Sequence, residues 1–334
     1  MVEGINLESV TDWVAQQIDD LNPPLKFELI AGGHSNLTYK FQDKSGKSFV
    51  LRRPPLGHVL ESAHDMAREF RIITAVSKSA VPVPETRGLC EDEGVNGSPF
   101  YVMDYVEGLV PHKAETVDDM PLGERHSFGV HVAEVLSDLH GVDPSDIGLG
   151  DLARKEAYLE RQLKRWTKQW EATKTHEIPE MDESLRLLKE DLPQQIGASI
   201  VHGDYRPGNM MIRSGRMVAL LDWELCTLGD PLADVGYWMN NWPQPGEEGA
   251  DASPTGSGGF PDRPELLDIY ADKTGRSLER INYYRAFSHW RLAAIVQGVY
   301  KRYLVGAMGD QEFDLETYKE GISQKARWAL ELLT

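Results

Sequence analysis

The sequence predicts an α+β protein with two lobes, in which a small antiparallel sheet precedes a larger, mainly helical part. Residues 27–105 contain short runs of strand-forming residues separated by glycine turns, with one helical pattern among them. The chain after Gly108 is dominated by long helical patterns instead. We therefore place the boundary after Glu107, giving an N-terminal lobe of residues 1–107 and a helical C-terminal lobe of residues 108–334 with a ligand-binding cleft between them.

The N-terminal lobe is predicted to begin with a helix over residues 7–20, because apolar side chains recur there at helical spacing before Pro23 and Pro24 end the pattern. A second helix is expected over residues 64–77. The strands predicted for the sheet cover residues 27–30, 38–42, 48–52 and 99–105. Together these elements form one antiparallel sheet with a helix against it.

The C-terminal lobe is predicted to be helical over residues 122–140, 151–171, 182–191 and a long set from residue 264 onward. Residues 198–222 differ, because their pattern indicates short strands and turns around a polar loop. Residues 243–263 are rich in Pro, Gly and acidic or small residues. We interpret them either as a mobile insertion without function or as a lid over a ligand.

Charge and cysteine content exclude several classes of protein. The net charge of −18 argues against a nucleic-acid or anionic-membrane partner, since these favour a positive surface. Two cysteines, Cys90 and Cys226, are too few for a disulfide framework or a Cys-rich metal site, which suits a reducing, cytoplasmic location. The first residues lack a signal-peptide pattern and no apolar run approaches about 18 residues, so no membrane insertion is expected.

The densest group of residues with catalytic potential is HGDYRPGN, residues 202–209. An apolar run, a turn and a second apolar run follow, and Asp222 comes directly after the second run. If the two runs pair as a hairpin, Asp204, Asn209 and Asp222 lie at the same end of the strand pair. Two of these residues can supply the oxygen ligands that Mg²⁺ prefers, and the remaining carboxylate can orient an acceptor hydroxyl and take its proton. This set fits phosphoryl transfer.

The spacing H-x-D-x-x-x-x-N, followed thirteen positions later by an Asp after an apolar strand, resembles the aminoglycoside phosphotransferase and choline kinase branch of the protein-kinase-like fold. More narrowly, HGDYRPGNMMI, LLDWELCTLGDPLADVGYW and LRRPPLGHVLESAH resemble the kinase-like domain associated with certain acyl-CoA dehydrogenases. The similar segments extend from Ile30 to Tyr303. The resemblance implies a bilobal protein-kinase-like fold, with nucleotide bound by the N-terminal lobe and the catalytic loop and substrate site in the C-terminal lobe.

The resemblance implies that Asp204 is the catalytic base and that Asn209 and Asp222 hold Mg²⁺. Taken singly, an Asp or Asn in such a loop is most often a turn former. The joint spacing favours the functional interpretation. His202 and Asp234 are interpreted as structural, the first through packing and hydrogen bonding and the second as a support of the catalytic loop.

In the N-terminal lobe the resemblance implies an ATP site. A Gly-Gly turn between two strands lets backbone N–H groups approach phosphates, although the same turn also suits a simple hairpin. An arginine stands where protein kinases have a phosphate-clamping lysine, and its permanent charge and forked N–H groups suit phosphate. The implied nucleotide-binding residues of the turn, the strand, the helix and the interlobe hinge are Gly32, Gly33, Ser35, Asn36, Arg52, Glu69, Met103, Asp104 and Val106.

The predicted helix over residues 151–171 carries basic residues opposite its apolar face. We interpret this stripe either as a solvated surface or as a platform for an anionic substrate such as the phosphates of coenzyme A. The second interpretation agrees with the acyl-CoA dehydrogenase resemblance and disagrees with a polycationic aminoglycoside. The substrate-binding candidates on this helix and on a later one are Arg154, Arg161, Arg165 and Arg302.

The sequence thus predicts an ATP- and Mg²⁺-dependent kinase that transfers the γ-phosphoryl group to the hydroxyl of a small molecule, with a hydroxyacyl-CoA ranked first as acceptor. One alternative is an aminoglycoside- or choline-type O-phosphotransferase. The other is a nucleotide-binding pseudokinase that partners an acyl-CoA dehydrogenase. The replacement of the clamp lysine by Arg52 favours the pseudokinase, and the presence of Asp204, Asn209 and Asp222 opposes it.

Overall fold

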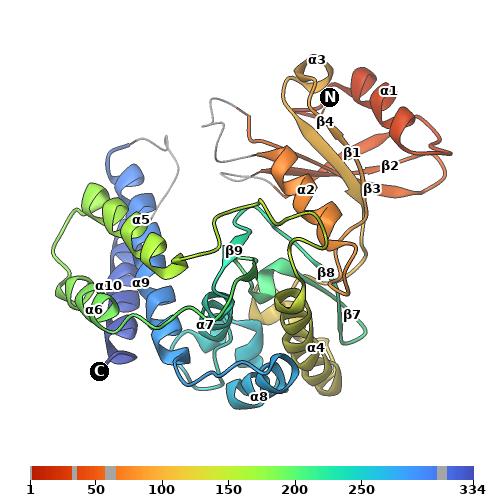
Figure 1. The fold of residues 1–334 in the computed structure, drawn as a ribbon. Helices are drawn as coiled ribbons and strands as arrows, with labels where there is room; N and C mark the ends of the chain where they lie inside the picture. The colour runs from red at the N-terminus through yellow and green to blue at the C-terminus, as the bar shows by residue number, and fades with distance from the viewer. Residues whose placement is uncertain (1, 32–35, 57–64, 307–313) are drawn as a thin grey trace.

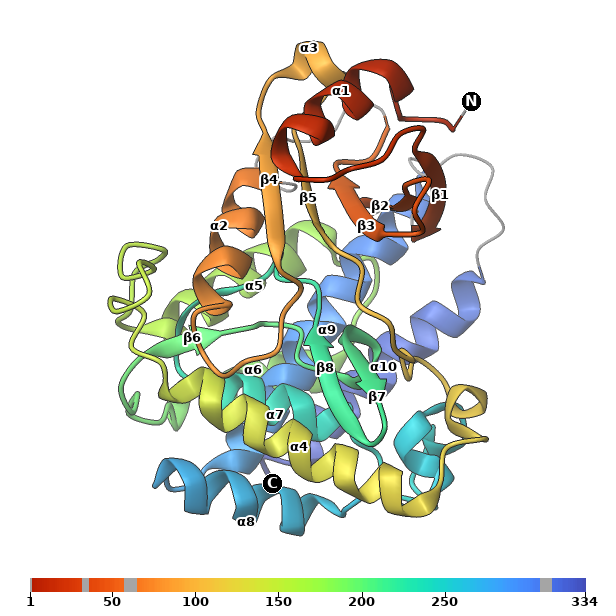
Figure 2. The same cartoon turned by 90° about the vertical axis from the view of Figure 1, so that its right-hand side faces the viewer.

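The computed structural model describes residues 2–31, 36–56, 65–306 and 314–334, which form a small sheet-containing lobe beside a larger helical lobe (Figures 1 and 2). The α+β class and the bilobal arrangement predicted from the sequence are confirmed. The exact boundary after Glu107 stays a prediction. Among these residues, no helix combines the length and the apolar character that crossing a membrane requires.

The N-terminal lobe contains, in the described residues, an antiparallel sheet with the strand order β1-β2-β3-β5-β4. Its elements are α1 (Leu7–Gln17), β1 (Lys26–Ala31), β2 (Leu37–Gln42), β3 (Ser48–Arg53), α2 (Met66–Val76), β4 (Thr86–Cys90), α3 (Glu93–Asn96) and β5 (Phe100–Asp104). Sequence patterns predicted α1, α2 and four of the strands but missed β4. That strand contains Gly88, on which Trp13 of α1 packs so closely that a Cβ would lie 2.9 Å from its ring.

The two faces of this sheet carry different side chains. Leu51 of β3 belongs to the apolar cluster under α1, whereas Val50 belongs to the cluster that includes α2, because successive side chains of a strand point to opposite faces. Arg52 therefore lies on the α2 face. Arg53 lies on the α1 face, where its guanidinium donates to the carbonyl of Gly4.

The C-terminal lobe consists mainly of helices around two short strand pairs. Its elements are η2 (Ala114–Val117), α4 (Leu122–Gly141), α5 (Tyr158–Thr173), α6 (Pro179–Glu190), β6 (Ser199–Val201), η3 (Pro207–Asn209), β7 (Met210–Arg213), β8 (Arg216–Leu220), β9 (Thr227–Gly229), α7 (Leu232–Asn240), η4 (Ala250–Ala252), η5 (Pro254–Ser257), α8 (Arg263–Thr274), α9 (Ile281–Leu304) and α10 (Leu315–Glu331). The predicted hairpin after residue 209 is present as the antiparallel pair β7 and β8.

Two parts of this lobe differ from the sequence prediction. The helix expected over residues 151–171 begins only at Tyr158, and turns and bends precede it. The segment 243–263, expected to be a mobile loop, contains two short 3₁₀ turns and is tied to α4. Arg125 of α4 is 6% exposed, and its Nη1 donates to the carbonyl of Ser257 at 3.1 Å. A buried guanidinium thus fixes this segment to the lobe.

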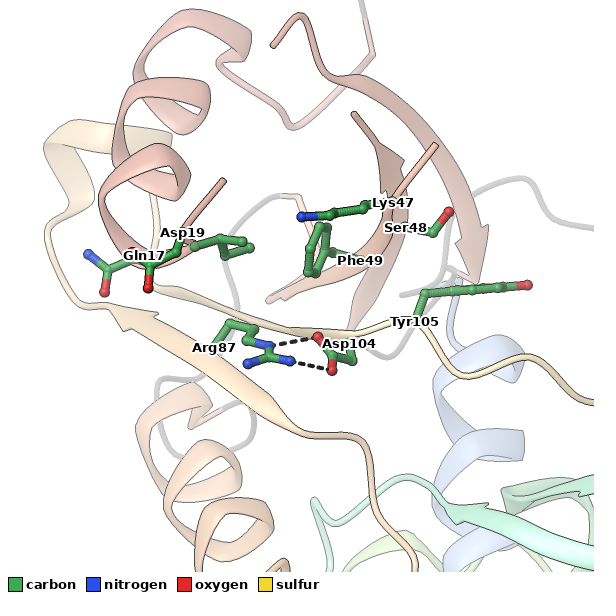
Figure 3. Close-up of a pocket in the computed structure, with 9 residues that line it drawn as sticks. Gln17, Asp19, Lys47, Ser48, Phe49, Arg87, Asp104 and Tyr105 are labelled. Carbon is green, nitrogen blue, oxygen red and sulfur yellow. Dashed lines mark hydrogen bonds and ion pairs between the residues drawn. The ribbon is translucent and has the colours of Figure 1, made fainter. Parts of the chain in front are cut away.

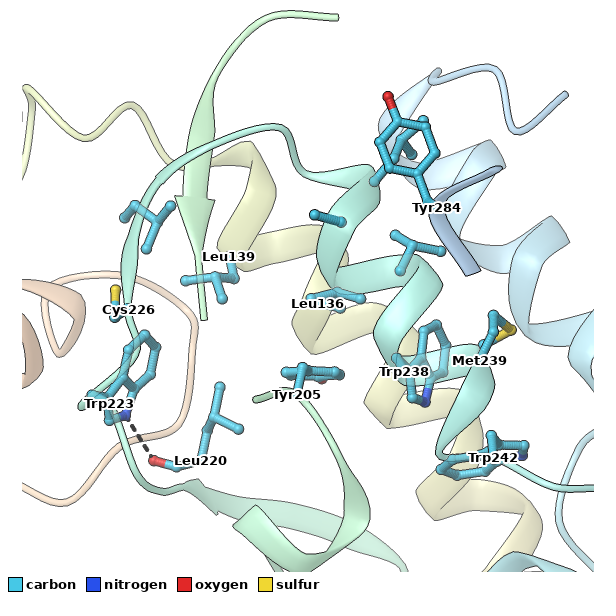
Figure 4. Close-up of a cluster of buried hydrophobic side chains, with 14 of the residues drawn as sticks. Leu136, Leu139, Tyr205, Leu220, Trp223, Cys226, Trp238, Met239, Trp242 and Tyr284 are labelled. Carbon is cyan, nitrogen blue, oxygen red and sulfur yellow. Dashed lines mark hydrogen bonds between the residues drawn. The ribbon is translucent and has the colours of Figure 1, made fainter. Parts of the chain in front are cut away.

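The polar segment 202–209 rests on a core of large buried side chains (Figure 4). The rings of Tyr205 and Trp238 meet edge to face at 6.1 Å, and the ring of Trp223 lies 4.7 Å from that of His202. The Tyr205 hydroxyl donates to a backbone carbonyl of α4 at 2.7 Å. Because close-packed interiors resist displacement, the segment has a rigid floor.

Gly236 of α7 lies where this helix touches α9, and a Cβ there would come within 2.6 Å of the backbone carbonyl carbon of Tyr284. We expect Gly236→Ala to lower the free energy of unfolding by about 1–3 kcal/mol, because the two helices must move apart. Gly321→Ala in α10 is the matched control, since its nearest neighbour is Lys325 Nζ at 3.8 Å. The control should gain about 0.5–1 kcal/mol from reduced chain entropy. Urea unfolding measures both, and equal stabilities would contradict the packing argument.

Candidate active site

The loop of residues 202–209 connects β6 to β7, and a buried carboxylate holds its backbone. Asp234 of α7 is 1% exposed, and it accepts the N–H of His202 at 2.6 Å and that of Gly203 at 2.8 Å. His140 Nε2 lies 3.3 Å from the same carboxylate. Burial alone would raise the pKa of Asp234, but the hydrogen bonds and the charge of its neighbours hold that pKa below its ordinary value. An ionised Asp234 therefore fixes the start of the loop.

Within this loop the structure brings Asp204 and Asn209 together. Asn209 Nδ2 donates to Asp204 Oδ2 at 2.6 Å and to the Asp204 carbonyl oxygen at 2.9 Å. Both amide hydrogens of Asn209 are used in this way, so its Oδ1 is the atom left for a metal ion. Two residues that the sequence interpretation did not single out also reach Asp204. The Tyr237 hydroxyl donates to Oδ1, and Arg206 Nε lies 3.2 Å and 3.3 Å from the two carboxylate oxygens.

The β7–β8 hairpin brings Asp222 next to this pair, as the sequence predicted. The N–H of Leu221 donates to the carbonyl of Asn209 at 2.8 Å, so the residues that flank the two strands are neighbours. Arg52 Nη2 lies 2.9 Å from Asp222 Oδ1, and Arg52 Nε lies 3.2 Å from Glu69 Oε2. Arg52 therefore joins the helix glutamate of one lobe to the candidate metal ligand of the other.

Burial and charge act in opposite directions on this group. Burial by itself would lower the pKa of Arg52, but the carboxylates of Glu69 and Asp222 raise it, so the guanidinium keeps its charge. Burial raises the pKa of Glu69, and Arg52 opposes that rise. The Arg52–Glu69 pair is buried, with side chains 13% and 3% exposed, and either partner left alone would be a costly buried charge.

Glu224, two residues after Asp222, is a further acidic side chain beside this group that the sequence interpretation did not assign to it. Its Oε2 is buried and has no hydrogen-bond partner among the described residues. Burial, with the charge of Asp222, raises the pKa of Glu224 to about 7. In the part of the chain that the structure describes, no set of three or more His, Cys, Asp or Glu side chains has the arrangement of a metal site. The candidate Mg²⁺ ligands remain the oxygens of Asn209 and Asp222, and Glu224 lies beside Asp222.

The hinge strand β5 places its two predicted nucleotide contacts differently. Met103 is 8% exposed and belongs to the apolar cluster on the α2 face. Asp104 lies opposite Phe49 in the sheet and pairs with Arg87 at 2.7 Å, beside a cavity of about 490 Å³ (Figure 3). Its side chain is thus on the face away from Arg52, since directly opposed residues share a face. Asp104 can contribute to a nucleotide site only through its backbone.

Three residues of the predicted phosphate-binding turn, Gly32, Gly33 and Ser35, lie outside the described residues. Asn36, which follows them, is 4% exposed at the start of β2. Beyond the hinge, the N–H of Val106 makes no backbone hydrogen bond within the described ranges. This leaves a donor for an adenine base at the position that the sequence interpretation proposed.

Two arginines of α2 reach the helical lobe, and sequence reasoning missed both. Arg68 Nη2 donates to the carbonyl of Cys226 at 2.6 Å, and Arg71 Nη2 donates to the carbonyl of Gly148 at 2.8 Å. These bonds hold α2, and therefore Glu69, against the helical lobe. Arg71 also pairs with the Asp151 carboxylate, but the two other acceptors are backbone carbonyls, which no residue type in the sequence signals.

The predicted substrate-binding arginines do not all share one helix. Arg161 Nη2 donates to the carbonyl of Arg154 at 2.6 Å, so these two residues are neighbours, but Arg154 precedes α5 rather than lying on it. The Arg165 guanidinium lies 5.0 Å from the ring of Trp166. Arg165 follows Arg161 by about one turn of α5. The structure therefore places Arg161 and Arg165 in the N-terminal half of α5, with the backbone of Arg154 beside Arg161 and the Arg154 guanidinium 3.7 Å from Glu156.

Arg302 lies elsewhere. It is exposed in the last turn of α9. Its neighbour Lys301 donates to the carbonyl of Ala172, near the C-terminal end of α5. Arg302 is therefore near the opposite end of α5 from Arg161, and the structure does not bring it together with the other three arginines.

Comparison with known proteins identifies the family. A model of the phosphotransferase enzyme family matches residues 26–269. The chain belongs to this family. Among solved structures, a candidate aminoglycoside phosphotransferase from Ralstonia eutropha aligns with a TM-score of 0.82 and 33% identity, over 98% of this chain and 97% of that one. The kinase-like fold predicted from the sequence motifs is confirmed by this likeness.

The curated relatives of this phosphotransferase family member are named as acyl-CoA dehydrogenase family members. The chain is 36% identical over 290 residues to acyl-CoA dehydrogenase family member 10 of Mus musculus and 34% identical over 281 residues to acyl-CoA dehydrogenase family member 11 of Homo sapiens. The matches cover 85% and 82% of this chain but 27% and 36% of the two relatives. The chain therefore spans roughly a third of the length of these relatives.

Glu224→Gln should change how the stability of the nucleotide-free protein depends on pH. The folded protein keeps the Glu224 proton up to about pH 7, whereas the ordinary pKa is 4.5. Between these values the folded state binds more protons than the unfolded state, so the free energy of unfolding falls as the pH rises. Glutamine cannot lose a proton, and the fall should be shallower in the variant.

Urea unfolding at several pH values between about 4.5 and 8 measures this difference. Glu28→Gln, at an exposed position of β1, is the matched control and should keep the wild-type slope. A Glu224→Gln slope equal to that of wild type would show that Glu224 does not hold its proton in the folded state.

Proposed function

We propose that the protein is an ATP- and Mg²⁺-dependent kinase that transfers the γ-phosphoryl group of ATP to a hydroxyl group of a small molecule. The observation that carries the proposal is the juxtaposition of Asp204, Asn209 and Asp222 at the end of the β7–β8 hairpin. Membership of the phosphotransferase enzyme family supports it. The group contains the oxygen ligands for a metal ion and one further carboxylate, as phosphoryl transfer requires.

The residues present fit a magnesium–nucleotide complex. Asn209 Oδ1 and the Asp222 carboxylate are hard oxygen ligands, which Mg²⁺ prefers. When bound there, the ion neutralises charge on the phosphates. Arg52 pairs with both Glu69 and Asp222, and its Nη2 side can exchange Asp222 for a phosphate oxygen while Glu69 keeps the Nε side in place. The nucleotide is thus proposed to lie on the α2 face of the sheet, with its adenine base hydrogen-bonded to the N–H of Val106.

Asp204 is the proposed base. The acceptor oxygen forms its bond to the γ-phosphorus as the bond between that phosphorus and the ADP oxygen breaks, and the hydroxyl proton passes to the Asp204 carboxylate. Arg206 lies beside this carboxylate with its side chain 42% exposed, so it can present positive charge to the transferred group. Its place two positions after Asp204 in the same motif is the signal that sequence reasoning could have used.

A hydroxyacyl-CoA is the proposed acceptor. The similarity to acyl-CoA dehydrogenase family members supports this class of acceptor. An acyl-CoA dehydrogenase is the proposed partner, and the proposed location of both proteins is the cytoplasm. The basic residues Arg154, Arg161 and Arg165 suit the phosphates of coenzyme A. The alternative, an aminoglycoside- or choline-type acceptor, draws support from the likeness to the candidate aminoglycoside phosphotransferase. Arg302, away from the other arginines, is the weakest of the proposed contacts.

Asp204→Ala is expected to reduce acceptor-dependent ADP release by roughly 10²–10⁴-fold, the usual contribution of a general base. The assay supplies Mg²⁺-ATP with hydroxyacyl-CoAs, aminoglycosides and choline, each in a separate reaction. Asp272→Ala, at an exposed position of α8, is the matched control and should keep the wild-type rate.

The panel also separates the alternatives. Turnover of hydroxyacyl-CoAs alone supports the first acceptor class, and turnover of aminoglycosides or choline alone replaces it with the second. Calorimetric binding of ATP without turnover of any acceptor contradicts the kinase proposal and favours the pseudokinase. A wild-type rate in Asp204→Ala would remove Asp204 from the proposed chemistry.

A further inference from the structure

We propose that Tyr237 is a positioning residue for the phosphoryl transfer and that it acts by fixing the orientation of the Asp204 carboxylate. The inference rests on the proposed function, in which Asp204 is the base. The Tyr237 hydroxyl donates to Asp204 Oδ1, and Asp204 is the partner that the structure gives to this hydroxyl. No feature of the sequence marked Tyr237 as part of the site.

The position of Tyr237 on α7 explains why it can do this. Asp234 and Tyr237 are three residues apart, and residues with this spacing lie on the same face of a helix. Asp234 binds the backbone N–H groups of His202 and Gly203, while Tyr237 binds the side chain of the next residue, Asp204. One helix face thus sets both the backbone of the catalytic loop and the direction of its carboxylate.

Tyr237 is itself held rigidly. It is 8% exposed, and the Arg291 guanidinium of α9 lies 5.5 Å from its ring centroid. Arg291 Nη2 also donates to the carbonyl of Gly203 at 3.2 Å. Arg206, the charged donor to Asp204, is 42% exposed and lies at 3.2–3.3 Å, so it is less constrained than Tyr237. The Tyr237 hydroxyl is therefore the more rigid of these two donors, and it sets the position of Asp204 Oδ1.

The carboxylate has about four lone-pair positions. Asn209 occupies one on Oδ2, Tyr237 occupies one on Oδ1, and Arg206 bridges the two oxygens. The acceptor hydroxyl must therefore take one of the positions that Arg206, the more exposed donor, fills in the ligand-free protein. Without the Tyr237 hydroxyl, the carboxylate can rotate about its Cβ–Cγ bond while Asn209 holds only one oxygen, and fewer bound acceptors are aligned for attack.

Tyr237→Phe tests the inference, because it removes the hydroxyl and keeps the ring under Arg291. With the acceptor that wild type phosphorylates fastest, we expect kcat to fall about 10- to 100-fold, the effect of losing one hydrogen bond to a charged group. The KM for Mg²⁺-ATP should stay within about twofold, because Tyr237 touches none of the proposed nucleotide ligands. In an Asp204→Ala background, Tyr237→Phe should change the residual rate by less than about twofold, since residues that act as a unit are not additive.

Tyr283→Phe is the matched control. Its buried hydroxyl donates to the carbonyl of Leu188 at 2.7 Å, so it loses a comparable hydrogen bond away from the loop. This variant should lose thermal stability and keep the wild-type kcat. The inference is overturned if Tyr237→Phe keeps the wild-type kcat, if its effect is equally large without Asp204, or if kcat and nucleotide KM change together. If the wild-type protein phosphorylates no acceptor, the proposed function is refuted, and the inference about Tyr237 is refuted with it.

Discussion

The buried carboxylate of Asp234 is the group on which the rest of the site depends. At 1% exposure it is stable as an anion only because two backbone N–H groups and a nitrogen of His140 replace water. Gly203, one of the donors, has a φ of 86°, and a Cβ there would meet the Leu225 carbonyl oxygen at 2.8 Å. Position 203 of the loop therefore requires glycine. The position of Asp204 follows directly from this arrangement, because it is the next residue along the chain.

The contact between the lobes is a second constraint, and it is built from arginines. Arg52, Arg68 and Arg71 all extend from the N-terminal lobe to carboxylates or carbonyls of the helical lobe. A guanidinium stays charged and offers several N–H groups, so one side chain can bind two elements at once. Arg52 consequently holds Asp222 in place before any ligand arrives. Under the proposed function, a metal ion and Arg52 would compete for Asp222, so a phosphate that binds Arg52 would free Asp222 to act as a metal ligand.

The features that sequence could predict are those with a local cause. Apolar runs flanking a turn predicted the β7–β8 hairpin, and with it the neighbouring positions of Asn209 and Asp222. Strand β4 was missed because its short sequence lacks that pattern and owes its place to packing under α1. The relation of Tyr237 to Asp204 could not be predicted, because it arises from a helix packed against a loop more than thirty residues away along the chain. Glu224 carried a partial signal in its spacing from Asp222, but its burial depends on the tertiary structure.

Tyr158 connects the first turn of α5 to the strands that carry the loop of residues 202–209. Tyr158 is 2% exposed, and burial raises its pKa to about 12. Its ring occupies the space beside Gly229, where a Cβ would come within 2.2 Å. Gly229 ends β9, which pairs with β6, the strand that leads into the loop of residues 202–209. The first turn of α5, and therefore Arg161, is positioned by the same strands that position Asp204. If α5 recognises the acceptor as proposed, Arg161 keeps a fixed position relative to Asp204, because both are held by elements of the same helical lobe.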